Sequence, residues 1–225
     1  MPETQLRITD DGSHTLFNPH FGETYHSSFG AIQESNHVFI RAGLENLDKA
    51  LAEIKILEVG FGTGLNALLS LIWASEHKKR IRYFGIEAFP PHDDVLKRIN
   101  YPELLKIDRL LFQKLHDPAG TEKRVTPEFT LHVAFETVQA VKLPPENFDL
   151  VYFDAFSPVA QPEMWSQPIF RKLHEAMKPG GFLTTYSSSG MVKRALRASG
   201  FRIARLSGPP GKREMLRASK EKVSG

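Results

Sequence analysis

The residues from Ile56 to Asn66, Ile-Leu-Glu-Val-Gly-Phe-Gly-Thr-Gly-Leu-Asn, constrain this chain more than any other segment. An apolar run that predicts a buried strand passes into three glycines at alternate positions and then into a predicted helix. Glycines in such a turn permit positive φ angles and a close approach of the backbone to a ligand. The segment therefore predicts a strand–turn–helix unit with a ligand at the carboxyl end of the strand.

The spacing of the glycines narrows the class of ligand. Gly60, Gly62 and Gly64 form G-x-G-x-G, whereas nicotinamide and flavin sites use G-x-G-x-x-G, and no Gly-Lys-Ser/Thr follows as in a P-loop. Glu58 supplies a carboxylate, which suits a cationic ligand better than a pyrophosphate. This arrangement resembles the first motif of the class I S-adenosylmethionine methyltransferases, and the resemblance implies that Glu58, the glycines and Phe61 bind that cofactor.

Strands and helices are predicted to alternate along the rest of the chain. The predicted strands are 55–60, 82–87, 128–134, 148–154 and 181–187, and the predicted helices are 64–77, 92–116 with an interruption at Pro102, 164–177 and 190–199. Residues 201–206 and 213–217 read as a final hairpin. Such alternation predicts an α/β fold with a doubly wound, mostly parallel sheet, and the terminal hairpin resembles the seven-stranded class I methyltransferase fold.

The sequence divides the chain into three predicted parts. Residues 1–53 are expected to form an N-terminal extension that covers the site, with a hairpin of 5–8 and 15–18 across Asp11-Gly12 and a helical segment at 31–53. Residues 54–218 are expected to form the methyltransferase domain. Residues 219–225 are expected to be a frayed tail.

Further cofactor contacts are expected just after the next two strands, because ligands of open α/β sheets lie outside the carboxyl ends of the strands. Glu87 ends the second strand, where a carboxylate can accept both ribose hydroxyls. Ala88 and Phe89 follow it and are expected to bind the cofactor, with Phe89 beside the adenine. After the third strand, Phe135 is expected to stack on the adenine and Glu136 to bind its amino group, although the more usual Gly-Asp pair is absent.

Asp154 ends the fourth predicted strand, where the methyl donor and the acceptor should meet. A carboxylate in that place can hold an amine by hydrogen bonding and orient its lone pair. Asp154 is therefore the candidate catalytic residue and also borders the cofactor. Asn66, at the start of the first helix, is expected either to bond to the cofactor or to cap the helix.

Four short motifs occur in order: Asp-Ala-Phe-Ser-Pro at 154–158, Pro-Glu-Met-Trp-Ser at 162–166, Lys-Pro-Gly-Gly at 178–181 and Lys-Arg-Glu-Met-Leu at 212–216. With Tyr-His-Ser at 25–27 and the segment 34–39, they resemble the methyltransferase domain of the MnmC-type tRNA wobble-uridine modification enzymes over residues 17–218. The resemblance implies methylation of the side-chain amine of 5-aminomethyl-uridine, often 2-thiolated, at tRNA position 34. It places Tyr25, Ser27 and Phe156 in the substrate pocket and Lys212 and Arg213 against tRNA.

Some members of that family carry a fused flavin oxidase domain. No second glycine-rich dinucleotide motif occurs in this sequence, so we expect a stand-alone methyltransferase without flavin. The chain has no cysteine, which excludes disulfides, thiolate metal sites and the cysteine-dependent methylation of carbon 5 in an unmodified pyrimidine. No metal is expected. An alkyl amine needs no such covalent help, because it is a nucleophile when neutral.

Charge and hydropathy indicate the partner and the compartment. Residues 189–225 hold ten of the 29 Lys and Arg residues but two of the 26 Asp and Glu residues, so a polyanion such as the tRNA anticodon loop is an expected partner. The longest apolar run is too short to span a bilayer, and the N-terminus lacks a secretory signal, so we expect no membrane association and a cytoplasmic location.

Two other functions remain open on sequence grounds. One is a class I methyltransferase or aminopropyltransferase of a small amine, against which the basic C-terminal region and the motif at 212–216 argue. The other is a catalytically silent protein of the same fold that binds RNA or a partner, against which the intact Glu58, Glu87 and Asp154 argue. Nothing in the sequence indicates the oligomeric state.

Overall fold

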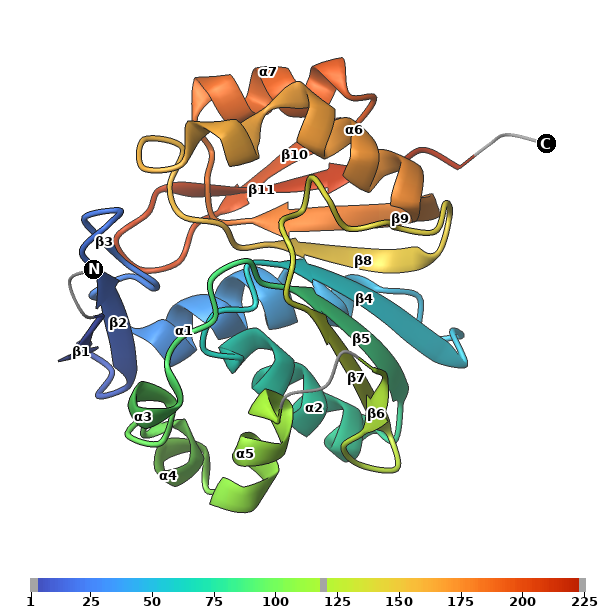
Figure 1. The fold of residues 1–225 in the computed structure, drawn as a ribbon. Coiled ribbons are helices and arrows are strands. Elements are labelled where there is room, and N and C mark those ends of the chain that lie inside the picture. The colour runs from blue at the N-terminus through green and yellow to red at the C-terminus, as the bar shows by residue number, and fades with distance from the viewer. Residues whose placement is uncertain (1–3, 118–120, 223–225) are drawn as a thin grey trace.

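A central sheet of eight strands organises the chain in the computed structural model, which describes residues 4–117 and 121–222 (Figure 1). The strand order is β10-β11-β9-β8-β4-β5-β7-β6. The strands that pair parallel are β4 (Glu53–Val59), β5 (Arg80–Ile86), β7 (Phe129–Ala134), β8 (Phe148–Phe153) and β9 (Met177–Thr185). Strands β6 (Lys123–Arg124) and β11 (Glu214–Ser219) run in the opposite direction, and β10 (Arg202–Ser207) pairs antiparallel with β11 and so runs in the direction of β9. This confirms the predicted doubly wound, mostly parallel sheet with its terminal hairpin.

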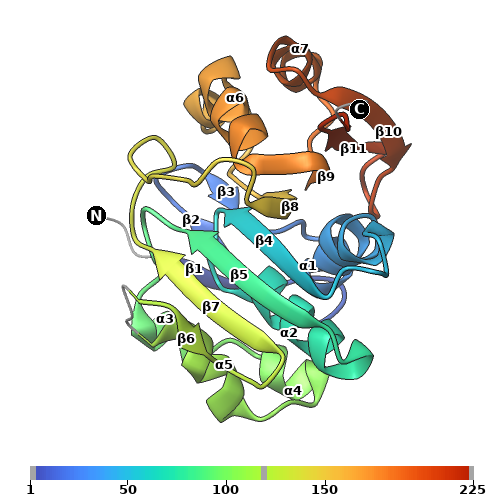
Figure 2. The same ribbon diagram turned by 90° about the vertical axis from the view of Figure 1, so that its right-hand side faces the viewer.

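The sheet has one strand more than the seven that the resemblance implies. The addition, β6, has two residues and pairs antiparallel with β7 at the edge of the sheet. Chain order reverses between β4 and β8 (Figure 2). From β4 the sheet continues through β5 to β7 in one direction, and through β8 to β9 in the other. Ligands of open α/β sheets bind at such a switch point, so the crevice between β4 and β8 is the expected place for the site.

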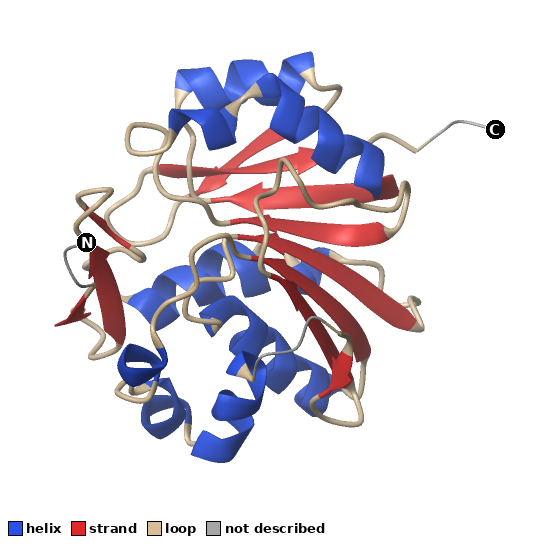
Figure 3. Cartoon of the chain, in the orientation of Figure 1, coloured by secondary structure: helices blue, strands red, loops and turns tan. Residues whose placement is uncertain are grey.

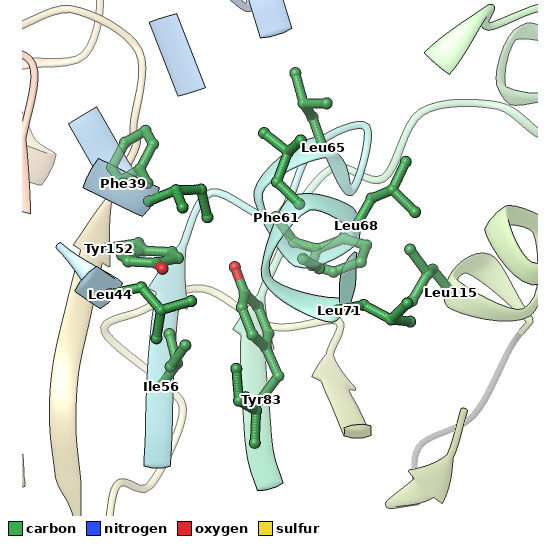
Figure 4. Close-up of a cluster of buried hydrophobic side chains, with 14 of the residues drawn as sticks. Phe39, Leu44, Ile56, Phe61, Leu65, Leu68, Leu71, Tyr83, Leu115 and Tyr152 are labelled. Carbon is green, nitrogen blue, oxygen red and sulfur yellow. The ribbon is translucent and has the colours of Figure 1, made fainter. Parts of the chain in front are cut away.

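Helices cover both faces of the sheet (Figure 3). The first face carries α1 (Ala31–Ser35), α2 (Leu65–His77), α3 (Asp93–Leu96), α4 (Tyr101–Leu105) and α5 (Arg109–His116), and the second carries α6 (Gln167–Ala176) and α7 (Gly190–Ala198). The core of the first face packs Leu65, Leu68 and Leu71 of α2 against Tyr83 and Tyr152 of the sheet (Figure 4). A second core lies between the sheet and the helices of the other face. Because the parallel strands are buried on both faces, their sequences are near-continuous apolar runs.

Two predicted helices have different boundaries in the structure. The segment 92–116 forms three short helices, and Pro102 lies in the first turn of α4, where the missing N–H costs no helical hydrogen bond. Pro102 therefore starts a helix, where the sequence predicted an interruption. The segment 164–177 begins as a 3₁₀ helix, Pro162–Trp165, and continues as α6 with Pro168 in its first turn.

The Lys-Pro-Gly-Gly motif at 178–181, which precedes the predicted strand 181–187, lies inside β9. Gly180 has a φ of 84° there, and the pairing between β8 and β9 shifts register, so the glycines form an irregularity within the strand. The neighbouring strand β11 runs to Ser219, and Lys220 exchanges backbone hydrogen bonds with Gly180 and Gly181. Residues 223–225 of the predicted tail lie outside the described part.

The N-terminal segment forms a small antiparallel sheet of β1 (Gln5–Ile8), β2 (His14–Asn18) and β3 (Glu23–Thr24) beside the carboxyl ends of the central strands (Figure 1). The predicted pairing of 5–8 with 15–18 is present, and Gly12 has a φ of 81° in its turn. After α1 the chain continues as a π-helix, Asn36–Arg41, and a 3₁₀ helix, Leu44–Asn46, so helical structure ends before the predicted residue 53. Throughout the described ranges, none of the helices has both the length and the hydropathy required to cross a membrane.

Candidate functional site

A cavity of about 270 Å³ lies at the carboxyl ends of the parallel strands, and we call it the first cavity. The loops after four neighbouring strands line it: Gly60 and Gly62 after β4, Glu87 to Phe89 after β5, Glu136 to Gln139 after β7, and Asp154 to Phe156 after β8. Asn18, Phe21 and Tyr25 of the N-terminal segment close one side. The first cavity therefore occupies the switch point that the topology favours for a ligand.

The glycine loop fits tightly against its neighbours. A Cβ atom at Gly60 would lie 2.4 Å from the carbonyl oxygen of Asp154, and one at Gly62 would lie 3.2 Å from the ring of Tyr25. Both residues have positive φ angles, 90° and 51°, that favour glycine. The amide N–H of Asp154 donates to the carbonyl oxygen of Val59 at 2.9 Å, which binds the loop after β8 to the end of β4. Glycine is thus required for both conformation and space.

Glu87 borders the first cavity in a fixed orientation. Its two carboxylate oxygens accept backbone N–H groups from Gly62 and Phe89, both at 2.8 Å. Burial raises the pKa of Glu87, and the backbone hydrogen bonds partly oppose that shift. Ala88 and Phe89 also line the cavity. These three residues lie where the sequence predicted them, and their contacts to a ligand stay predictions.

Four residues predicted to touch the cofactor do not line the first cavity. Glu58 is fully buried and accepts hydrogen bonds at 2.8 Å from the Asn66 amide nitrogen and from the Tyr83 hydroxyl. The ring of Phe61 packs in the core against Gly85 (Figure 4). None of Glu58, Phe61 and Asn66 lines the cavity, and neither does Gly64, which precedes α2. Successive side chains of β4 point to opposite faces of the sheet. Val59 faces the cavity, so its neighbour Glu58 faces α2 on the other side.

The two residues that directly follow β7 lie in different environments. Glu136 lines the first cavity, whereas the ring of Phe135 is 48 % exposed and is not among the lining residues. The expected stacking of Phe135 on adenine therefore finds no support in this geometry. Thr137, Val138 and Gln139, to which the sequence analysis gave no role, complete this wall.

Asp154 is shared by two cavities. It lines the first cavity and also a second cavity of about 430 Å³ on the side of the N-terminal segment. The Asn66 amide nitrogen donates to Asp154 Oδ2 at 2.9 Å and to Glu58 Oε1 at 2.8 Å, so one side chain joins both carboxylates. Burial raises the pKa of Asp154 to about 7, with a further rise from Glu34 and opposing effects of Asn66 and Lys212. Asp154 can therefore exchange a proton near neutral pH.

The second cavity lies between the two ends of the chain. Its lining residues are Arg7, Phe17, Gly22, Glu23, Thr24, Tyr25, His26, Ser27, Glu34, Asp154, Ser157, Tyr186 and Lys212. Tyr25 and Asp154 belong to both cavities, so the two spaces adjoin at these side chains. Burial raises the pKa of Tyr25 to about 12 and lowers the pKa of His26 to about 4, so both are neutral at pH 7.

Contacts across the second cavity hold the N-terminal segment in place. Glu23 of β3 accepts the N–H and the hydroxyl of Ser157, at 3.1 and 2.5 Å. Lys212 donates to Glu34 at 2.5 Å and lies 3.9 Å from the ring centre of Tyr186, whose hydroxyl donates to the carbonyl oxygen of Ala155. These roles of Glu23, Glu34 and Tyr186 have no signal in the local sequence, because each depends on a partner distant in the chain.

The predicted substrate-pocket residues divide between different places. Tyr25 and Ser27 line the second cavity, whereas Phe156 lines the first and stacks on Phe21 at 4.4 Å between ring centres. The ammonium group of Lys212 pairs with Glu34. Arg213 is exposed and lines a shallow depression next to the second cavity. Within the described ranges, no group of three or more residues is arranged to hold a metal ion.

Comparison with known proteins gives concordant matches. A family model described as S-adenosyl-L-methionine-dependent methyltransferase matches residues 102–221, just over half of the chain. A Burkholderia thailandensis protein named tRNA 5-methylaminomethyl-2-thiouridine biosynthesis bifunctional protein MnmC is 32 % identical over 94 % of the chain, which spans 34 % of that protein. The chain thus spans about a third of the length of this curated relative.

Two solved structures extend the comparison. The crystal structure of MnmC2 from Aquifex aeolicus matches with a TM-score of 0.79 and 29 % identity, covering 99 % of this chain and 72 % of the other. Spermidine synthase from Thermotoga maritima matches with a TM-score of 0.55 and 13 % identity, over 100 % of this chain and 72 % of the other. The second match concerns the fold alone.

Proposed function

The chain belongs to the S-adenosyl-L-methionine-dependent methyltransferases, and we propose that it methylates the aminomethyl amine of the wobble uridine in tRNA. The product would be 5-methylaminomethyl-uridine, or its 2-thio form, at position 34. The similarity of nearly the whole chain to a protein named for biosynthesis of that nucleoside supports this substrate. The observation that carries the proposal is the position of Asp154, a carboxylate shared by the first and second cavities.

The first cavity suits the cofactor. Each Glu87 oxygen accepts one backbone N–H, which leaves a further lone pair on each oxygen for the ribose hydroxyls. Gly60 and Gly62 bring the backbone close to the cavity, where side chains would collide with Asp154 and Tyr25. We therefore assign cofactor binding to Gly60, Gly62, Glu87, Ala88, Phe89 and Glu136, with Asp154 bordering the cofactor at its methyl group and with Glu58, Phe61, Gly64 and Asn66 as supports beneath them.

The second cavity suits the amine. S-adenosyl-L-methionine supplies an electrophilic methyl group when it is bound. An aliphatic ammonium ion must first lose a proton, and Asp154 can take it because burial raises its pKa to about 7. Held by Gly60, Gly62 and Glu87, the cofactor would supply its methyl group to this neutral nitrogen and would keep the electron pair of the carbon–sulfur bond on sulfur. The product is a secondary ammonium ion.

The surroundings of the second cavity favour a polyanionic substrate. Arg205 and the exposed Arg213 line a shallow depression that shares Ser157, Tyr186 and Lys212 with the second cavity. Arg41 lines a further depression that also contains Lys212. Arginine side chains at such positions can bind phosphate oxygens and thereby position an RNA loop without reading its sequence. We accordingly place the anticodon loop across these depressions and the activity in the cytoplasm.

A methylation assay tests the proposal. The protein is incubated with S-adenosyl-L-methionine and with tRNA carrying 5-aminomethyl-uridine, and the nucleosides are then analysed by mass. We expect this nucleoside to gain one methyl group. Methylation of free polyamines in place of tRNA would support a small-amine enzyme, and absence of cofactor binding would support a catalytically silent module; either result would overturn the proposal.

A further inference from the structure

Glu34 and Lys212 form an ion pair inside the second cavity although they are 178 residues apart in the chain. Lys212 Nζ lies 2.5 Å from Glu34 Oε1, and the side chains are 33 % and 9 % exposed. The same ammonium group lies 3.9 Å from the ring centre of Tyr186. The other carboxylate oxygen of Glu34 accepts the Ser27 N–H at 2.7 Å. Both charges are therefore held in defined places.

Asp154 shares this cavity and also borders the first cavity. Apart from Glu34 and Lys212, the titratable groups around it belong to three sets: Glu58 through the Asn66 amide with the neutral Tyr25, Tyr83, Tyr101 and Tyr186; Arg7, Glu23 and His26 of the second cavity; and Glu87, Glu136 and Glu163 of the first cavity. Glu23 is engaged by Ser157, the guanidinium group of Arg7 lies over the Phe17 ring, and buried His26 is neutral. Glu34 and Lys212 are thus the charges of opposite sign that act on Asp154 from the second cavity.

We propose that Glu34 and Lys212 are positioning residues that set the charge around Asp154 for proton transfer from the acceptor amine. Glu34 keeps Asp154 basic enough to take the proton, and Lys212 offsets Glu34 so that Asp154 is ionised at neutral pH. This inference rests on the proposed function, in which Asp154 receives the proton. The directions agree with the pKa of Asp154, which Glu34 raises and Lys212 lowers.

The main alternative explanation is that the ion pair has a purely structural role. The pair connects α1 with the β10–β11 hairpin, where the His37 ring also contacts the Ser207 carbonyl oxygen at 2.8 Å and the Phe29 ring packs on Gly211. Removing either charge breaks the same ion pair, so a structural link predicts that both variants change activity in the same direction. A role through charge predicts opposite shifts of the pH profile. The two explanations are therefore distinguished by whether the two variants change the protein in the same direction or in opposite directions.

The first experiment compares Glu34→Gln with Lys212→Met in the pH dependence of kcat/KM. Glu34→Gln removes a negative charge, lowers the pKa of Asp154 and moves the acid limb to lower pH, while its amide oxygen can still accept the Ser27 N–H. Lys212→Met removes a positive charge and moves the acid limb to higher pH. We expect shifts on the order of one pH unit, which is about a tenfold change in the ionised fraction. The double variant should return close to the wild type.

A second measurement needs neither tRNA nor turnover. The carboxyl carbon of Asp154 is followed by NMR in protein labelled at aspartate carboxyls, and its signal is assigned by its loss in Asp154→Asn. Its titration midpoint should fall in Glu34→Gln and rise in Lys212→Met. Arg82→Met and Glu122→Gln serve as controls, because they break an exposed ion pair of 2.6 Å at the start of β5 and should leave the midpoint unchanged.

Shifts of the same sign in both variants, or an unchanged midpoint, would overturn the inference. Failure of the wild-type protein to methylate the tRNA would overturn the proposed function instead, and the carboxyl titration would still report on the charge around Asp154. The two failures are therefore distinguishable.

Discussion

The side-chain nitrogen of Asn66 lies 2.9 Å from the Asp154 carboxylate and donates a hydrogen bond to it. The same nitrogen donates to buried Glu58 at 2.8 Å. The residue that the sequence offered as a cofactor contact or a helix cap is therefore the link between two acidic groups at the ends of neighbouring strands. Glu58 acts from below the site, as an acceptor that fixes the orientation of Asn66.

Replacing Asn66 should cost both stability and turnover. In Asn66→Leu, Asp154 and Glu58 lose a hydrogen-bond donor in a buried place, and such a loss costs about 1 to 3 kcal/mol. Urea unfolding and kcat measure the two effects. Asn46→Leu, which alters an exposed asparagine on the 3₁₀ helix, is the control and should change neither by much. Equal effects of the two variants would contradict the linking role of Asn66.

Asp154→Asn should separate cofactor binding from catalysis. An amide oxygen can still accept the Asn66 hydrogen bond, but the side chain cannot take a proton from the amine. We expect kcat to fall by about 10² to 10⁴-fold, with cofactor affinity nearly unchanged. Single-turnover kinetics and calorimetry of cofactor binding check the two halves. A parallel loss of binding would place Asp154 in the cofactor site alone.

The same substitution should stabilise the protein at alkaline pH. Burial raises the pKa of Asp154 from 3.8 to about 7, so the folded state binds the proton more tightly than the unfolded state. Wild-type stability contributed by this group therefore falls as pH rises from about 4 to about 7. The Asp154→Asn variant has no group there to ionise, so it avoids this loss of stability. Its free energy of unfolding, relative to that of the wild type, should therefore rise more at pH 8 than at pH 5. A gain that is larger at pH 5 would contradict the raised pKa.

Gly60→Ala tests the tight contact between the glycine loop and Asp154, which directly follows β8. The added Cβ would lie 2.4 Å from the Asp154 carbonyl oxygen at a φ of 90°. Gly12→Ala is a matched control, since Gly12 has a φ of 81° and nothing within 4 Å of the added atom. Gly12→Ala should cost about 1 to 2 kcal/mol from its backbone conformation. Gly60→Ala should cost more and should weaken cofactor binding. Equal costs would contradict the close contact.

The local pattern of the sequence predicted most of the fold and part of the site. Alternating apolar runs and glycine turns placed the parallel strands and the terminal hairpin, and the rule that ligands lie at strand ends placed Gly60, Gly62, Glu87 and Asp154 around one cavity. These features depend on periods of two to four residues, so they are visible in the chain itself.

What the sequence could not supply depends on distant partners. The Lys212–Glu34 pair forms only when the final hairpin reaches α1, and Glu23 meets Ser157 only after the N-terminal strands fold over β8. Glu58 could have been placed inward by the alternation of β4, but its partner Tyr83 comes from the neighbouring strand. Pro102 begins a helix, although the pattern predicts an interruption, because a proline inside a periodic segment and a proline that starts a new helix have similar local patterns.

Asp154 is proposed to serve an amine acceptor in tRNA, and labelling of the transferred methyl group identifies that acceptor. The protein is given S-adenosyl-L-methionine with a labelled methyl group and an equal mixture of tRNA carrying 5-aminomethyl-uridine and the same tRNA with unmodified uridine. Nucleoside mass analysis should find the label in 5-methylaminomethyl-uridine alone, and Asp154→Asn should abolish it. Label in any other nucleoside, or none in a protein that binds the cofactor, would contradict the account.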